Sequence, residues 1–198
     1  MKKDNNTISL THKQNDILRQ EVDQLKRTLS DIVVNAKEND RLFDKTKGLI
    51  LALMDVKTLA DYCQVLFSHL TDSFGVSHYQ LHLFDYEKKI DIPHLCVDSS
   101  ATAENKLGAL FNPKSKYQLG LFREKELGYL FPNVDSKEIK SAALLLITDQ
   151  KNTIIGLLSL GSLDPDYYHH HLDTLFIDFL LEVIKRQIPG LVHGYGTV

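Results

Sequence analysis

Three histidines and one cysteine fall close together along two short apolar segments of this 198-residue chain. In residues 76–84 the side chains alternate, so His78, Gln80 and His82 share one face of an expected strand. In residues 90–97, His94 and Cys96 have the same two-residue spacing. Imidazole and thiolate groups are ligands of zinc, copper and haem iron, so the pattern raises the question of a metal or haem site.

The two segments are expected to pair as an antiparallel hairpin through a turn at residues 85–89. In the register that we expect, His78 lies opposite Cys96 and Gln80 lies opposite His94, on the face that also carries His82. No CxxC or HxxxH spacing fixes these groups as ligands. Two interpretations stay open, a metal or haem site and a polar, half-exposed face. We favour the second and assign no metal ligand.

A catalytic apparatus is not expected. The sequence contains no GxSxG elbow, no phosphate-binding glycine-rich loop, no GxGxxG, no HExxH and no EF-hand loop. We therefore expect a protein that is not an enzyme, and the residues identify no cofactor.

The segment 98–140 shows neither helical nor strand periodicity throughout, and it is too long for a simple loop. We therefore expect it to form a structured cover over one face of a sheet. Short helices are expected at 103–110 and 123–130. Such covers commonly roof a ligand pocket. Arg123 either faces solvent or contacts an anionic ligand there. The candidate pocket residues are His78, Gln80, His82, His94, Cys96 and Arg123.

The sheet that positions these residues is centred on an apolar hairpin. Residues 142–148 and 153–160 are apolar runs without helical spacing, and they flank a polar turn at 149–152. Strands buried on both faces need helices on at least one side of the sheet. One helix is expected to begin at Thr58, which has capping-box spacing with Asp61, and another to follow the hairpin and end at Pro189-Gly190.

A heptad repeat occupies the N-terminal part of the chain and predicts a coiled coil. Glu21 at g and Lys26 at e suit a parallel homodimer. The alternative is a helix that packs only against its own domain. The expected seam consists of Leu18, Val22, Leu25, Leu29, Ile32, Ala36, Asn39 and Phe43.

Charge and residue composition limit the classes of binding partner and the cellular compartment that we expect. A net charge of −3 does not favour nucleic acid as a partner. Cys63 and Cys96 fall in an expected helix and an expected strand, which favours reduced thiols over a disulfide framework. No apolar run approaches the length of a membrane span. We expect a cytoplasmic protein that binds no membrane.

Several segments together resemble a bacterial family, domain-of-unknown-function family 484. They are residues 38–43 (ENDRLF), 74–76 (FGV), 141–144 (SAAL) and above all 156–165 (GLLSLGSLDP). That family resembles GAF domains, which are cytosolic sensory modules, and the resemblance implies a GAF-like fold with an N-terminal helical extension. The chain departs from the family at Tyr167 and Tyr168, where Phe is frequent, and at Leu119-Gly120, where Cys-Gly is common, so no thiol-dependent function is implied there.

These observations predict an α+β fold, with a GAF-like antiparallel sheet of about five to six strands, helices on one face and the cover segment on the other. The expected divisions are a flexible N-terminus (1–10), a coiled-coil helix (11–47), the GAF-like domain (48–188) and a flexible tail (189–198). The expected function is a non-enzymatic sensory or regulatory module that binds an unidentified small molecule and homodimerises, with a protein partner as a further possibility. The alternative is a structural or adaptor protein with a collapsed pocket that acts only through protein contacts.

Overall fold

A computed structural model describes residues 4–86, 90–149, 151–170 and 174–194 of the chain. The chain divides into two compact units, residues 1–44 and 45–198. The long helix α1 (Asp4–Met54) supplies the first unit, and its last turns, from Lys45, belong to the second. The second unit is an α+β domain. The flexibility that we expect for residues 1–10 stays a prediction, and residues 195–198 of the expected tail lie outside the described residues.

The domain contains a five-stranded sheet with the order β2-β1-β5-β4-β3. The strands β1 and β2 run parallel, and every other neighbouring pair is antiparallel. The sheet is therefore mixed, which corrects the purely antiparallel expectation at one edge. The strands are β1 (His78–Phe84), β2 (Leu95–Asp98), β3 (Tyr117–Gly120), β4 (Ser141–Thr148) and β5 (Ile154–Ser162).

The expected central hairpin is confirmed. All residues of β4 are buried, and β4 pairs with β5 from Ser141 opposite Ser162 to Thr148 opposite Ile154. At the turn, one carboxylate oxygen of Asp149 accepts hydrogen bonds from two backbone N–H groups further along the chain, each at 2.8 Å. The turn residue Gln150 lies outside the described residues.

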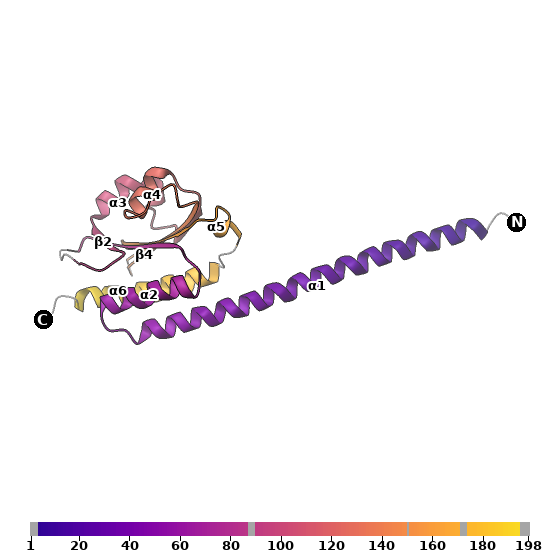
Figure 1. The fold of residues 1–198 in the computed structure, drawn as a ribbon, viewed down its shortest axis with the longest axis horizontal. Coiled ribbons are helices and arrows are strands. Elements are labelled where there is room, and N and C mark those ends of the chain that lie inside the picture. The colour runs from indigo at the N-terminus through magenta and orange to yellow at the C-terminus, as the bar shows by residue number, and fades with distance from the viewer. Residues whose placement is uncertain (1–3, 87–89, 150, 171–173, 195–198) are drawn as a thin grey trace. The chain divides into compact units, whose positions relative to one another are not determined.

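Helices cover both faces of the sheet (Figure 1). The helices α2 (Leu59–Asp72) and α6 (Thr174–Gly194) lie on one face, and α3 (Ser100–Leu107) and α4 (Glu124–Leu130) lie on the other. A 3₁₀ turn (Gly108–Leu110) continues α3, and the short α5 (Tyr167–His170) follows β5. The expected layers are confirmed, and we call the faces the helix face and the cover face.

The expected start of α2 is also confirmed. Thr58 has an extended backbone, and its side-chain oxygen accepts the backbone N–H of Asp61 at 3.2 Å. This bond satisfies one of the N–H groups that have no partner within the first helical turn.

The hairpin expected between residues 76–84 and 90–97 is wrong. The strand β2 begins only at Leu95 and runs parallel to β1, with His82 beside Cys96. Residues 90–94 form no strand, because Pro93 has no N–H to donate and His94 has a positive φ of 59°. The chain turns there and enters β2 in the direction of β1. Residues 87–89 of the expected turn lie outside the described residues.

Two further expectations need correction. The last helix does not end at Pro189-Gly190 but continues to Gly194, with Pro189 inside it. Ile188 and Val192 are buried, so packing on both sides of the proline holds the helix together. The sequence did not predict the strand β3 inside the cover segment, because four residues are too few for alternation to identify a strand.

Candidate functional site

The alternation of β1 assigns its side chains to the two faces. Tyr79 stacks on Phe67 of α2, with ring centroids 4.5 Å apart, so the odd-numbered residues of β1 lie on the helix face. His82 stacks on Tyr129 of α4, at 5.1 Å, so the even-numbered residues lie on the cover face. This division confirms the expected alternation.

Five polar residues lie together on the cover face, and we call them the cover-face cluster. The pairing of β1 with β5 places Ser159 opposite Gln80. The pairing of β1 with β2 places Cys96 beside His82. Paired residues in a sheet project to the same face. The cluster consists of His78, Gln80, His82, Cys96 and Ser159.

His82 connects the sheet to the cover. Its Nε2 atom lies 3.3 Å from the carbonyl oxygen of Leu130. A carbonyl oxygen only accepts, so Nε2 carries the hydrogen and Nδ1 is left as an acceptor. Nδ1 is buried and has no hydrogen-bond partner among the described residues. Burial lowers the pKa of His82, against the opposing effects of the Leu130 carbonyl and Asp98, so the neutral ring is favoured.

A carboxylate and a phenol flank the cluster. The Tyr129 hydroxyl donates to Asp98 Oδ2 at 3.2 Å. Burial, and then the charge of Asp98, raises the pKa of Tyr129, so the phenol keeps its proton. The other oxygen of Asp98 accepts the backbone N–H of Ser99 at 2.8 Å. This arrangement fixes Asp98 at the end of β2, close to the cluster.

Cys96 is not an activated nucleophile. The Gln80 side-chain amide donates to its sulfur at 3.2 Å. Burial, and then the negative charge of Asp98, raises the pKa of Cys96, so the neutral thiol is favoured over the thiolate. The thiol acts here as a weak polar contact.

Two more buried polar atoms in the cluster have no hydrogen-bond partner among the described residues. They are the hydroxyl oxygen of Ser159, whose residue has no exposed surface, and Nε2 of His78. Buried polar groups are normally paired with protein atoms, ordered water or a ligand, because an unpaired group loses its hydration without compensation. The cluster is therefore the part of the cover face that is chemically suited to hold a small polar molecule.

Beside the cluster, the cover face is apolar and closely packed. Phe84 and Leu144 of the sheet belong to one buried group with Leu107 and Leu130 of the cover. A Cβ built on Gly161 would lie 3.2 Å from the ring of Phe131, so a larger residue at this position would have to displace its neighbours. Apolar packing thus fills much of the space that the sequence assigns to a pocket.

Two of the six candidate pocket residues lie apart from the other four. The His94 ring packs on the helix face, with its centroid 4.8 Å from that of Tyr79 and 5.9 Å from that of Phe67. Arg123 precedes α4, and its side chain is 88% exposed and lies 3.9 Å from Glu126. The other four belong to the cover-face cluster. The structure adds Ser159, Tyr129 and Asp98, and only Ser159 carries a sequence signal, as a hydroxyl inside an apolar run.

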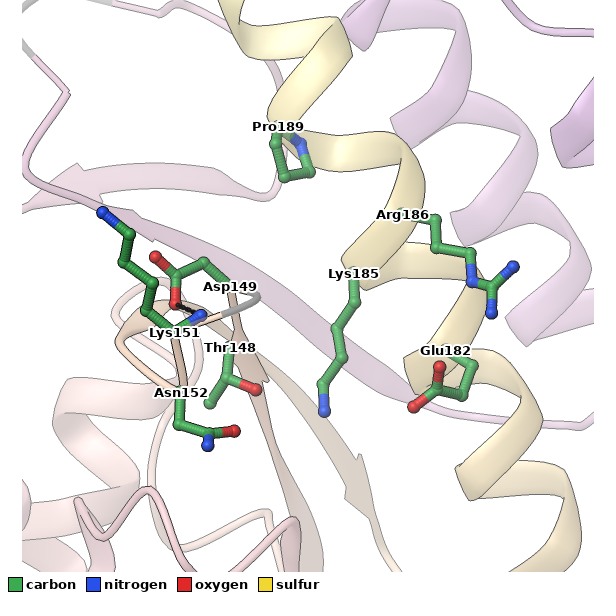
Figure 2. A pocket seen from close by; sticks show the side chains of 8 residues that line it. All are labelled: Thr148, Asp149, Lys151, Asn152, Glu182, Lys185, Arg186 and Pro189. Carbon is green, nitrogen blue, oxygen red and sulfur yellow. Dashed lines mark hydrogen bonds between the residues drawn. The ribbon is translucent and has the colours of Figure 1, made fainter.

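A separate hollow of about 820 Å³ lies on the helix side, between the β4–β5 turn and α6 (Figure 2). The lining includes three cationic side chains and two carboxylates. This mixture of charges favours neither an anionic nor a cationic ligand. Figure 2 shows the Lys185 side chain extending from α6 toward the hairpin. The sequence did not predict this hollow. Its lining consists of Thr148, Asp149, Lys151, Asn152, Glu182, Lys185, Arg186 and Pro189.

Two kinds of feature are absent from the described part of the chain. No three or more His, Cys, Asp and Glu side chains come together in an arrangement that would hold a metal ion. None of the helices in that same part combines the length and the apolar character that crossing a membrane requires.

Solved structures show which fold this is. The chromophore-binding domain of a bacteriophytochrome from R. palustris matches with a TM-score of 0.54 and 14% identity, over 78% of this chain and 63% of that one. The GAF domain of an Acinetobacter phosphoenolpyruvate-protein phosphotransferase matches with a TM-score of 0.54 and 13% identity, over 79% and 96%. The chromophore-binding domain of Stigmatella aurantiaca phytochrome P1 matches with a TM-score of 0.51 and 13% identity, over 74% and 59%.

The chain spans about three fifths of each of these two phytochrome chains. At these identities the similarity concerns the fold, which is that of GAF domains. No curated protein matches the sequence. The sequence model of the family described as "Protein of unknown function, DUF484" matches residues 1–192, and the chain belongs to that family.

Proposed function

We propose that the chain is a non-enzymatic, GAF-like sensory or regulatory module that binds a small molecule between the sheet and the cover and homodimerises through its N-terminal helix. Ligand binding is supported by two buried atoms on the cover face that have no hydrogen-bond partner among the described residues, His82 Nδ1 and Ser159 Oγ. A bound molecule that hydrogen-bonds to both would compensate for their lost hydration.

The chemistry of the cluster supports binding rather than catalysis. Cys96 favours the neutral thiol and Tyr129 keeps its proton, since the pKa of each is raised. His82 is bonded to the Leu130 carbonyl at one nitrogen, and no base in the described part of the chain is bonded to the Ser159 hydroxyl. A nucleophile activated by an adjacent base is therefore not assembled here.

Exposed apolar residues support homodimerisation through the N-terminal helix. Leu25 and Leu29, at d and a of the heptad, are 62% and 61% exposed in the helix by itself. The seam repeats through several heptads, as in parallel two-stranded coils. A second copy of the chain would bury these side chains, and a change in the domain would then reach a partner through the paired helices.

Two unpaired thiols support the cytoplasmic location that the sequence predicts. Cys63 and Cys96 are free, and Cys63 is buried in α2. Free buried cysteines are common where glutathione keeps thiols reduced.

The adaptor function remains the second candidate, and it rests on a different observation. Apolar side chains of the sheet and the cover, Leu144 and Leu130 among them, pack together over much of the cover face. In this case the cover-face cluster would hold water alone, and the coil would do all of the binding.

Native mass spectrometry separates the two candidates. Full-length protein is equilibrated with a metabolite extract, and variants of two β5 serines are treated in parallel. The sensory module predicts a small-molecule adduct on the wild type and on Ser162→Ala, whose hydroxyl accepts the backbone N–H of Asp164 away from the cluster. The adduct should be lost in Ser159→Val, which blocks the cluster. If no adduct forms on any of the three proteins, the adaptor function stands instead.

A further inference from the structure

We propose that the ligand of the cover-face cluster is a neutral or cationic molecule that presents N–H or O–H donors, and that phosphates and carboxylates are excluded from this site. The inference rests on the proposed function, because it specifies the ligand of the same site. It follows from three properties of the residues around the cluster: which donors are already used, which acceptors are left, and where the positive charges lie.

Three hydrogen-bond donors at the cluster are already bonded to protein acceptors. The Nε2–H of His82 points at the Leu130 carbonyl, and the Tyr129 hydroxyl donates to Asp98. The Gln80 amide donates to the sulfur of Cys96. An anion would need donors for its oxygens, and the donors that are left, such as the second N–H of Gln80 and the hydroxyl of Ser159, are neutral and bind an anion less strongly than charged ones.

Two atoms of the cluster remain available to accept hydrogen bonds from a ligand. His82 Nδ1 is an obligatory acceptor, because the ring is neutral and its one hydrogen is on Nε2. It is buried and has no hydrogen-bond partner within the described part of the chain, and the same holds for the Ser159 hydroxyl, which can accept as well as donate. The two residues are diagonal neighbours on adjacent strands, since Ser159 lies opposite Gln80 and His82 is two residues further along β1. A ligand with one or two donor hydrogens matches this pair.

Among the described residues of the cover, no lysine or arginine is buried at the cluster. Every lysine and arginine in residues 99–140 of the cover is exposed, and Lys116 pairs with Asp178 of α6 at 3.2 Å. The charged group that does lie close is the Asp98 carboxylate, which would repel an anion. Burying a phosphate or carboxylate without a compensating charge is strongly unfavourable, whereas a cation would gain from Asp98.

Two series of matched probes test the charge of the ligand directly. Acetamidine, acetamide and acetate share one shape, as do benzamidine, benzamide and benzoate, and each series runs from a cationic donor to an anionic acceptor. The probes are titrated into full-length protein with ¹⁵N-labelled histidine, at pH 7.5. The ¹⁵N chemical shift of His82 Nδ1 is followed, because it moves toward the protonated value when this nitrogen accepts a hydrogen bond.

We expect the amidine or the amide of at least one series to shift His82 Nδ1, and the matched carboxylate to leave it unchanged. Ser159→Ala should weaken the binding of that probe about 2- to 12-fold, the range for one lost hydrogen bond. Ser162→Ala is the control, and it should leave the affinity unchanged, because Ser162 projects to the helix face.

The possible failures have different meanings. If acetate or benzoate shifts His82 Nδ1 with an affinity equal to or above that of the matched amide, the inferred ligand class is wrong while the proposed function stands. Wild-type affinity in Ser159→Ala would also contradict the inferred contact with the serine. If none of the six probes moves the signal, the inferred ligand class is wrong, and the proposed function is decided separately by the native mass spectrometry of the wild type and Ser159→Val.

Discussion

The Nε2 atom of His82 lies 3.3 Å from the carbonyl oxygen of Leu130, so one ring joins β1 of the sheet to the end of α4 in the cover. The other nitrogen of the ring has no partner among the described residues. A donor that binds at Nδ1 polarises the ring and strengthens the bond from Nε2 to Leu130. The same side chain that receives the ligand would thus hold the cover more firmly on the sheet.

The pH dependence of stability should report on His82. Its pKa is lowered in the folded protein, mainly by burial, whereas the unfolded value is about 6.5. As the pH falls below about 6.5, the unfolded chain takes up a proton that the folded chain does not, so the free energy of unfolding decreases by up to about 1.4 kcal/mol per pH unit. Urea unfolding of the wild type between pH 7.5 and 5 measures this loss.

The matched variant is His82→Gln, whose side-chain amide can still donate to Leu130. It should lose less stability than the wild type over the same interval, because glutamine does not titrate. Parallel curves for the two proteins would show that His82 contributes nothing to the acid sensitivity.

Two serines of β5 should respond oppositely to truncation. Ser159 has no hydrogen-bond partner among the described residues, so Ser159→Ala removes an uncompensated polar group and should keep or raise the free energy of unfolding, by up to about 1 kcal/mol. Ser162 accepts the backbone N–H of Asp164 at 3.1 Å, so Ser162→Ala should lower it by about 1 kcal/mol. Chemical denaturation compares the two. A loss of more than about 1 kcal/mol in Ser159→Ala would mean that its hydroxyl is paired.

Gly156 should not tolerate a side chain. A Cβ on this residue would lie 2.5 Å from the backbone oxygen of His82, which is held in the pairing of β1 with β5. Gly156→Ala should therefore cost at least about 2 kcal/mol, since a backbone atom must move. Gly128 in α4 has nothing within 4 Å of a built Cβ, and Gly128→Ala should stabilise the domain by up to about 1 kcal/mol. Thermal melts that rank the two variants in the opposite order would contradict this account of the sheet.

The coiled coil can be tested by exchanging charges. In a parallel dimer, Glu21 at g lies near Lys26 at e of the other chain. Glu21→Lys should weaken the dimer through like charges, and the double variant with Lys26→Glu should restore it. Sedimentation equilibrium over a range of protein concentrations measures each dissociation constant. Equal self-association in all three proteins would argue against the parallel register, and a monomeric wild type would argue against the coil itself.

The features of the fold that the sequence predicts correctly are those that depend only on residues close together along the chain. The apolar runs of β4 and β5 flank a polar turn, and the cap at Thr58 needs only Asp61 three residues later. The parallel entry of β2 was not predictable in this way, because it depends on Pro93 and on the positive φ of His94.

The candidate site was only partly predictable, for a similar reason. Alternation alone assigns His78, Gln80 and His82 to one face of β1. Their partners come from elsewhere in the chain: Ser159 from within an apolar strand and Tyr129 from the cover. Such contacts depend on tertiary packing, and the spacing of residues along the chain does not predict them.

A crystal structure of the full-length protein, purified in the folded state from its native host, would show whether the cover-face cluster holds a ligand. We expect a non-protein molecule at the cover face, with hydrogen-bond donors within about 2.7–3.2 Å of His82 Nδ1 and of Ser159 Oγ. It would be contradicted by a structure in which these two atoms are bonded only to water or to protein groups, with the apolar side chains of the cover closed over them.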